Sequence, residues 1–263
     1  DTVSGLWSTL TNKPGIGVMG SMAGTVDGIC YFWGGFQDTA VRVNDVYAYD
    51  PVSATWAQLA NMPMSQGRGA VCTIDRIFYG AGGATNTSEN TGDVVGHFQA
   101  FDTYSGLWST LTPMPTARMG PGAGAVGSIA YFGGGRVSAG STGLSAAHEA
   151  YDTISGLWSA VASLPVAQYL MMYCTVGTNI HYFGSYVTPA PQAHNVFTVN
   201  GDDHPESTLV IMYGYSQYLA RLAKDKKVDQ VLGIKGVYQT TVGKLNPVPS
   251  KTNLDGQGWT DVQ

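Results

Sequence analysis

Asp1-Thr2-Val3-Ser4-Gly5-Leu6-Trp7 opens the chain, and the same pattern returns three more times. The later copies occupy residues 50–56, 102–108 and 152–158, and each again runs from an aspartate to a tryptophan. Successive tryptophans are 49, 52 and 50 residues apart. Periods near fifty residues are typical of propeller blades, whereas tandem helical repeats are shorter. The opening stretch therefore already indicates a repeated β architecture.

Two further landmarks keep the same register. A glycine follows each tryptophan by 26 or 27 residues, and in three of the four copies it begins a Gly-Gly pair. A proline stands between the tryptophan and this glycine. The pairs are residues 34–35, 82–83 and 134–135, with Gly184-Ser185 in the fourth copy, and the prolines are Pro14, Pro63, Pro115 and Pro165. Three landmarks in one register define four tandem repeats, which we bound at residues 1–49, 50–101, 102–151 and 152–200.

The order of these landmarks resembles the kelch repeat. Tyr49-Asp50 leads to a tryptophan, then to Met62-Pro63, then to Arg68 and the double glycine, and the third copy repeats this order with Arg118. The first and fourth copies lack the arginine. The resemblance covers roughly the first 200 residues. It implies an all-β, kelch-type β-propeller of about four blades, each made of four antiparallel strands.

The local patterns agree with this architecture. In the second copy, strand-like stretches lie near residues 56–59, 69–74, 77–80 and 98–101. Four such strands form one twisted sheet, and only a neighbouring blade can cover its apolar face. We expect all four tryptophans to fill the gaps between blades, because they are large and apolar.

One position indicates a narrow ring. Ten residues before the double glycine, on the strand that the resemblance places nearest the axis, stand Gly24, Cys72, Gly124 and Cys174. Only small side chains fit a tight axis. The ring could close if the N-terminal tryptophan strand completed the last blade. Kelch rings more often have six or seven blades, so a truncated longer array is the alternative.

Composition changes near residue 200. Residues 1–200 hold 17 charged side chains, whereas the much shorter segment 201–263 holds 14. We treat residues 1–200 as the propeller and 201–263 as a small mixed α/β appendage. The appendage is expected to contain a strand at 208–213, a short amphipathic helix near 216–226 and a strand pair within 231–242.

Charge and hydropathy exclude some function classes. The chain has 263 residues, a net charge of −5 and only 12% charged residues, and no basic stripe indicates nucleic-acid binding. No apolar run approaches the length of a membrane span. Because residue 1 already lies inside a repeat, we expect a mature chain or an excised fragment. The three cysteines lie in apolar runs and are interpreted as buried small hydrophobes.

The sequence offers little for catalysis. The five histidines show no metal-ligand spacing, and no cofactor or metal is expected. The histidines beside third strands are expected at an exposed blade rim, and the aspartates that open the repeats to bind backbone amides in turns. Kelch enzymes that resemble galactose oxidase or a sialate mutarotase exist; Arg68, Arg118 and Glu149 are candidates for a mutarotase-like pocket, although nothing places them together. We expect no enzyme.

The connections after each double glycine are better functional candidates. They vary in length and sequence while the strands repeat, and they span residues 36–44, 84–96, 136–146 and 186–194. Variable loops on a rigid scaffold are where binding usually resides. The candidate ligand-binding residues in or near them are Arg42, Arg68, Arg118, Arg136, Asn86 and His194. For Arg68 and Arg118 an inter-blade hydrogen bond to backbone is an equally good interpretation, and their register predicts one shared strand face.

The interpretation is a non-enzymatic binding propeller with a protein or glycan ligand, protein being preferred because the loops hold few aromatics. Few charges and little lysine resemble secreted adhesins and virion appendages, so we expect an extracellular or particle-surface location. Two alternatives stay open: a structural subunit that docks, or forms oligomers, through residues 201–263, and a cytoplasmic kelch adaptor.

Overall fold

The computed structural model describes residues 7–37, 42–85, 94–138, 143–185 and 193–199, together with the backbone of three short strands further along the chain. The chain divides into two compact units, Asp1–Val199 and Asn200–Gln263.

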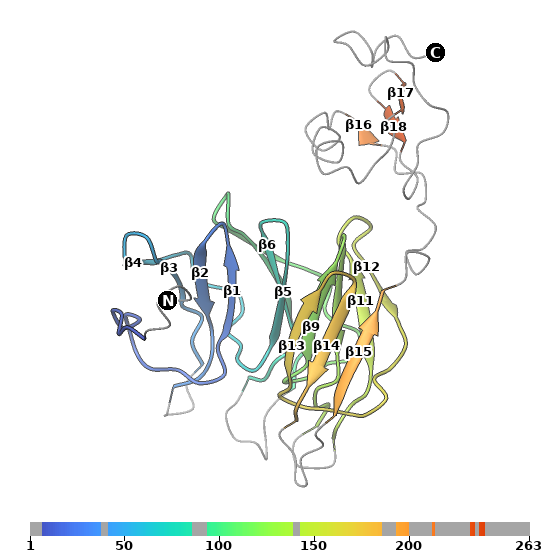
Figure 1. Cartoon of the computed structure of the whole chain (residues 1–263), viewed down its shortest axis with the longest axis horizontal. Helices are drawn as coiled ribbons and strands as arrows, with labels where there is room; N and C mark the ends of the chain where they lie inside the picture. The colour runs from blue at the N-terminus through green and yellow to red at the C-terminus, as the bar shows by residue number, and fades with distance from the viewer. Residues whose placement is uncertain are drawn as a thin grey trace. The chain divides into compact units, whose positions relative to one another are not determined.

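The first unit consists of successive antiparallel sheets, each a blade (Figure 1). Blade 1 contains β1 (Met22–Val26), β2 (Ile29–Trp33), β3 (Val46–Asp50) and β4 (Thr55–Gln58); blade 2 contains β5 (Ala70–Ile74), β6 (Ile77–Ala81), β7 (Phe98–Asp102) and β8 (Leu107–Thr110). Blade 3 contains β9 (Gly122–Val126), β10 (Ile129–Gly133), β11 (His148–Asp152) and β12 (Leu157–Ala160); blade 4 contains β13 (Met172–Val176), β14 (Asn179–Phe183) and β15 (His194–Thr198). The predicted four-bladed all-β propeller is confirmed.

The blades follow one another through their inner strands. β1 packs on β5, β5 on β9 and β9 on β13. Each tryptophan strand is the outermost strand of one blade, after which the chain crosses to the inner strand of the next. A sequence repeat that begins at the aspartate therefore straddles two blades.

Trp108 and Trp158 lie between neighbouring blades as expected, because they contact Trp33 of blade 1 and Phe98 of blade 2, respectively. Trp56 contacts Phe32 of its own blade. The three indole N–H groups donate to a backbone carbonyl four residues after the preceding tryptophan: Trp56 to Thr11 (3.2 Å), Trp108 to Ala60 (2.9 Å) and Trp158 to Thr112 (2.9 Å). Each ring also packs on an aromatic of its own third strand, Tyr49, Phe101 or Tyr151, with centroids 4.8, 4.9 and 5.2 Å apart. Each of these tryptophans thus combines a ring contact within its blade with a hydrogen bond to the segment that enters the same blade.

Trp7 does not behave in this way, and the two expectations that rest on it are wrong for this structure. Its side chain is 100% exposed, and it belongs to no strand. The fourth sheet has three strands in the described part of the chain. Residues 7–10 therefore do not complete blade 4, because Thr11 is held at the edge of blade 1 by Trp56.

The axial positions are occupied as predicted. Gly24, Cys72, Gly124 and Cys174 lie on the four inner strands and line an axial cavity of about 510 Å³. The backbone N–H of Val71 donates to the Tyr173 hydroxyl (3.1 Å), which links β5 to β13. The cysteines are not all buried: Cys72 is, and burial raises the pKa of its thiol, but Cys30 is half-buried and Cys174 is exposed. Cys174 is exposed because it lies in blade 4, on which no further described blade packs.

The repeat aspartates form the expected turns. In each described copy one carboxylate oxygen accepts the N–H of the residue two positions on, and the other accepts a serine hydroxyl: Asp50, Asp102 and Asp152 bind Ser53, Ser105 and Ser155 at 2.8–2.9 Å. Backbone and serine hydrogen bonds lower the pKa of Asp50. Asp1 lies outside the described residues.

In the second unit, β16 (Met212–Tyr213) and β17 (Leu232–Ile234) both pair antiparallel with β18 (Val237–Gln239). The expected helix near 216–226 lies outside the described residues. The described residues contain no helix that is long and apolar enough for a membrane span.

Candidate functional site at the loop end of the propeller

The four variable connections all leave the propeller at the same end. Each inner strand begins at that end and each second strand returns to it, so every connection to a third strand starts there. We call it the loop end; in Figure 1 it is the lower edge of the propeller. The opposite hairpin end carries the tight turns between inner and second strands and the aspartate turns.

A belt of backbone hydrogen bonds joins the four blades at the loop end. Gly20, Arg68, Gly120 and Leu170 occupy the same position before their inner strands, and all four have positive φ, between 49° and 65°. The N–H of Arg68 donates to Gly20 (2.8 Å), that of Gly120 to Arg68 (2.6 Å) and that of Leu170 to Gly120 (3.0 Å). Arg68 and Leu170 adopt a backbone conformation that side chains disfavour, because the belt demands it.

Beneath the belt lies an apolar plug of Phe36, Ala84, Met119 and Tyr169, one from each repeat and all at most 1% exposed. Arginines cover it. The Arg68 guanidinium lies 5.8 Å from the centre of the Phe36 ring, and that of Arg136 lies 4.4 Å from the Tyr169 ring. Belt and plug make the loop end a rigid platform between the connections.

The structure places the predicted site residues in different surroundings. Arg42 is exposed; burial and the Arg42 charge together lower the pKa of His97. Arg68 is half-buried, and Arg136, also at the plug, is only 6% exposed. His194 is exposed and lies 3.0 Å from His181 in a ring-nitrogen contact on blade 4. Asn86 lies outside the described residues.

Arg118 is fully buried instead of facing a ligand. Its Nη2 lies 3.1 Å from Oε2 of Glu149 and donates to the carbonyl of Phe132 (3.0 Å), while the Thr116 hydroxyl donates to Glu149 (2.7 Å). The structure thus brings together two of the three mutarotase-like candidates, but not Arg68. Arg68 and Arg118 do not share a strand face: both precede the inner strands, and only Arg118 points into its blade.

In blades 2 and 4, the two positions equivalent to Arg118 and Glu149 are joined by a hydrogen bond between side-chain amides. Gln66 and Gln168 stand sixteen residues before the double-glycine position of their repeats. Gln66 accepts a hydrogen bond from the Gln99 side-chain amide (2.8 Å), and Gln168 accepts one from the Asn195 side-chain amide (2.6 Å). We call this side-chain link, between the segment that enters a blade and the third strand of that blade, the clamp. The Arg118–Glu149 pair is its charged version in blade 3. The amide clamps were missed in the sequence, although their fixed distance from the double glycine is a signal that could have revealed them. A recurring buried clamp indicates a structural role.

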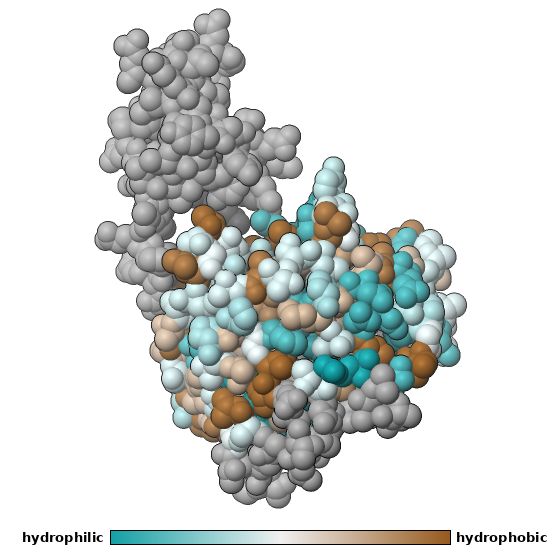
Figure 2. Space-filling model, turned by 180° about the vertical axis from the view of Figure 1, so that it is seen from behind, coloured by the Kyte–Doolittle hydropathy of each residue, from teal (hydrophilic) through white to brown (hydrophobic). Residues whose placement is uncertain are grey.

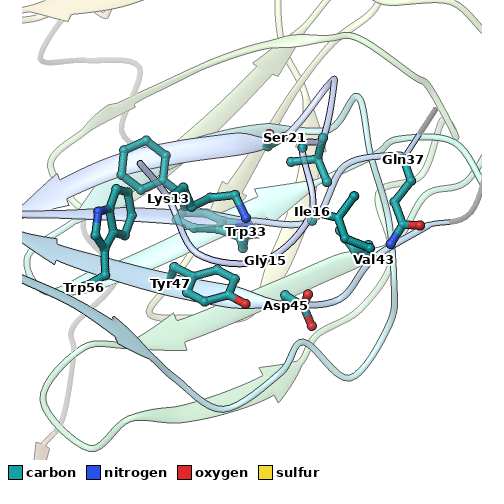
Figure 3. A pocket seen from close by; sticks show the side chains of 14 residues that line it. Lys13, Gly15, Ile16, Ser21, Trp33, Gln37, Val43, Asp45, Tyr47 and Trp56 are labelled. Atoms are coloured by element: carbon teal, nitrogen blue, oxygen red, sulfur yellow. The ribbon is translucent and has the colours of Figure 1, made fainter. Parts of the chain in front are cut away.

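Blade 1 lacks the clamp and holds a cavity of about 420 Å³ instead (Figure 3). Val18 and Tyr47 occupy the two clamp positions, and Gly15 and Gly17 contribute no side chain. Phe32, Trp33, Tyr47 and Trp56 supply aromatic walls, with Lys13, Asp45, Gln37 and Ser21 at the polar edge. The Lys13 ammonium lies 4.4 Å from the centre of the Tyr47 ring.

Exposed apolar side chains also gather at the loop end. They are Ile16, Met19, Val137, Val166 and Leu170, each between 39% and 62% exposed. In Figure 2 the brown areas are small and scattered, and several lie at the lower edge of the propeller beside strongly hydrophilic residues. Of these residues and the neighbouring arginines, methionine and arginine are the types enriched in protein–protein interfaces.

The expectation of an exposed histidine at the blade rim is wrong for His148. It is 2% exposed, with Nε2 3.1 Å from the Tyr182 hydroxyl and Nδ1 3.2 Å from the Ala162 carbonyl. Burial lowers its pKa to about 4. No cluster of three or more metal-ligating side chains occurs among the described residues.

We therefore expect stability to fall in acid through His148. Between pH 6.5 and 4 the unfolded chain binds a proton at this histidine and the folded chain does not, so the contribution is complete above 6.5 and is lost as pH falls to about 4, by roughly 3 kcal/mol. Urea unfolding at pH 7 and pH 4.5 measures this. His148→Gln should flatten the difference, whereas the exposed His181→Gln should leave it; equal slopes in both variants would contradict the assignment.

Comparisons with known proteins agree with the fold. The kelch motif model matches residues 23–63. A kelch-like protein, terF, from Aspergillus terreus is 27% identical over 51% of this chain and 31% of its own length, and the mouse (Mus musculus) Kelch-like protein 35 is 38% identical over 31% of this chain and 13% of its own. The chain thus spans less than a third of the length of these relatives.

A bacterial relative and a solved structure are also similar to this chain. N-acetylneuraminate epimerase from Pasteurella multocida is 35% identical over 29% of this chain and 22% of its own length. A solved structure titled "Structure of YjhT" superposes with a TM-score of 0.61 at 16% identity, covering 73% of this chain and 65% of that one. The latter supports the propeller fold alone.

Proposed function

Because this chain belongs to the kelch-repeat β-propeller family, we propose that it is a non-enzymatic binding module whose loop end holds a protein partner. One observation carries the proposal: the variable connections leave the propeller at the end where the belt and the plug present Met19, Leu170 and Arg68. Methionine and arginine are both enriched in protein–protein interfaces relative to the rest of the surface.

Two belt residues can be substituted in a way that removes a side chain and keeps the backbone conformation. Arg68 and Leu170 have positive φ, which asparagine tolerates, so Arg68→Asn and Leu170→Asn remove the contact groups without disturbing the backbone. Tyr104, 84% exposed at the hairpin end, gives the matched control Tyr104→Asn.

The probe is a phage-displayed library of random dodecapeptides panned on the full chain. We expect each loop-end variant to weaken the selected peptides at least about tenfold, and Tyr104→Asn to leave them unchanged, by biolayer interferometry. Peptides that respond to Tyr104→Asn and to neither loop-end variant would place the binding surface elsewhere.

A sugar ligand is the second candidate, supported by the similarity to an enzyme named for N-acetylneuraminate. The enclosed Arg118–Glu149 pair speaks against catalysis, since the Arg118 side chain is fully buried. Reproducible hits on a glycan array, lost in the same loop-end variants, would favour this candidate over a protein. NMR-detected epimerisation of N-acetylneuraminate would establish an enzyme.

Display outside the cell or on a particle surface belongs to the same proposal. It is supported by composition: residues 1–200 contain a single lysine, Lys13. Immunoelectron microscopy of the source cells or particles tests it, and label confined to the cytoplasm would contradict it.

A further inference from the structure

A crevice of about 250 Å³ lies between blades 2 and 3, on the side of the hairpin end. Blade 2 supplies residues of β6, β7 and β8 together with Leu111, which follows β8, and blade 3 supplies Tyr151 and Thr153. Blades 1 and 4 pack on the far sides of this pair, so the crevice lies inside the described series of blades.

The sequence repeat places an equivalent set of residues between blades 1 and 2. Six of the eight lining positions carry the same residue type there, namely Ile29, Tyr31, Ala48, Asp50, Leu59 and Thr103. The other two positions differ by one oxygen atom each: Ser109 stands where blade 1 has Ala57, and Tyr151 where blade 2 has Phe101. Two added hydroxyl groups therefore distinguish the crevice between blades 2 and 3.

Both added hydroxyls are available to a ligand. Among the residues that the structure describes, neither the Tyr151 nor the Ser109 hydroxyl has a hydrogen-bond partner. Ser109 is exposed, whereas Tyr151 is only 6% exposed and its ring packs on Phe98 and Trp158, with centroids 4.7 and 5.2 Å away. A hydroxyl can donate one hydrogen bond and accept two, so both groups can bind a polar ligand without breaking a contact of the fold.

The shared part of the lining adds a carboxylate and a fixed tyrosine. Burial raises the pKa of Asp102, but hydrogen bonds from Tyr104 and Ser105 outweigh it and lower the pKa, so the carboxylate is ionised at neutral pH. Within the described chain its Oδ2 accepts the Ser105 hydroxyl (2.9 Å) alone and keeps a further acceptor position. Tyr79 is hydrogen-bonded to Thr153, whose hydroxyl donates to a backbone carbonyl of blade 3 (2.8 Å).

We propose that this crevice binds a small neutral ligand with neighbouring hydroxyl groups, either a sugar ring or an acyclic polyol. Tyr151 and Ser109 hydrogen-bond its oxygens, Asp102 accepts one of its hydroxyls, and the tyrosine rings supply apolar walls for its C–H groups. The volume is below the roughly 300–1,000 Å³ of pockets for drug-sized ligands, which suits a ligand of this size.

Charge does not explain the difference between the two sets of residues. No basic side chain is among the described lining residues, so an anion would meet the Asp102 carboxylate without compensation. A cation would gain nothing from the two added groups, because Asp50 already supplies the same carboxylate between blades 1 and 2 and the added hydroxyls are uncharged. The difference therefore favours a ligand that is recognised by hydrogen bonds.

NMR titration of the full chain with two probes tests the site. Methyl β-D-glucopyranoside represents a sugar ring and erythritol an acyclic polyol, and the probe that binds more tightly identifies the kind of ligand. We expect Ser109→Ala and Tyr151→Phe each to weaken that probe about three- to tenfold, the usual effect of losing one hydrogen bond. The double variant, whose lining has the same residue types as the set between blades 1 and 2, should weaken it at least about tenfold.

Two variants control for the loss of a hydroxyl. Thr110→Ala changes the neighbour of Ser109 on the opposite face of β8, and Tyr104→Phe removes an exposed tyrosine hydroxyl at the hairpin end. Both should leave binding of the probe unchanged. Because the Ser109 and Tyr151 hydroxyls make no hydrogen bond within the described chain, the double variant should also unfold at the same temperature as the original chain.

The inference is overturned if neither probe binds saturably, or if the double variant binds the better probe as tightly as the original chain does. Arg68→Asn changes the opposite end of the propeller and should leave this binding as it is. Loss of peptide binding at the loop end is therefore a separate outcome from loss of probe binding in the crevice.

Discussion

Gly82→Ala is expected to destabilise the propeller by about 3 kcal/mol or more. Gly82 has a φ of +73°, which costs alanine roughly 1–2 kcal/mol. A Cβ at this position would also press against the backbone carbonyl oxygen of Arg118 in the segment entering blade 3, which cannot rotate away. That carbonyl accepts the N–H of Gly83 (2.8 Å), so the clash also weakens an inter-blade hydrogen bond. For a unit of this size, Tm should fall by roughly 10 °C.

Gly184→Ala is the matched control. Gly184 has nearly the same φ, +76°, but nothing lies within 4 Å of the position its Cβ would take. Only the backbone strain remains, so the cost should be about 1 kcal/mol. Thermal unfolding at a concentration where the chain is monomeric measures both variants. Equal losses would show that φ alone explains the double glycine and that the packing of the next blade plays no part.

The environment of the Gly-Gly pair also explains why the fold could be predicted from the sequence. The first glycine of each pair leaves room for a carbonyl of the next blade (Gln66, Arg118 or Gln168), and the second donates its N–H to that carbonyl. The requirement recurs at every blade junction, so it repeats at a fixed distance from the tryptophan. In the fourth copy no described blade follows, and Ser185 stands in place of the second glycine.

The candidate site was less predictable because its determinants are not periodic. Arg118 and Gln66 occupy equivalent positions in the structure, but the two residue types differ in charge and size. Only the arginine was therefore a candidate in the sequence. Arg68 stands where two other repeats have glycine, so its positive φ follows from the belt and not from its own preference. Burial of His148 and exposure of Trp7 depend on which blade lies beside them, which a single repeat does not encode.

Glu149→Gln is expected to cost about 3 kcal/mol, although it changes few atoms. The variant leaves the Arg118 guanidinium fully buried without its counter-charge. Nε and Nη1 of Arg118 already have no hydrogen-bond partner, so the carboxylate is its main compensation. Burial lowers the pKa of Arg118 and the Glu149 charge opposes this. Removing one partner of a buried ion pair typically costs about 3–5 kcal/mol.

The double variant Arg118→Gln/Glu149→Gln should restore most of this loss, because it rebuilds in blade 3 the amide clamp that Gln66 and Gln99 form in blade 2. We expect it to lie within about 1 kcal/mol of the original chain, and Arg118→Gln alone to lose about 2–3 kcal/mol. Urea unfolding of the four proteins gives the coupling energy, which should exceed about 2 kcal/mol. Additive losses would mean that the two side chains act independently. A double variant that folds normally but loses ligand binding would instead show that the charged pair is retained for function, since the clamp needs no charge to hold the blade.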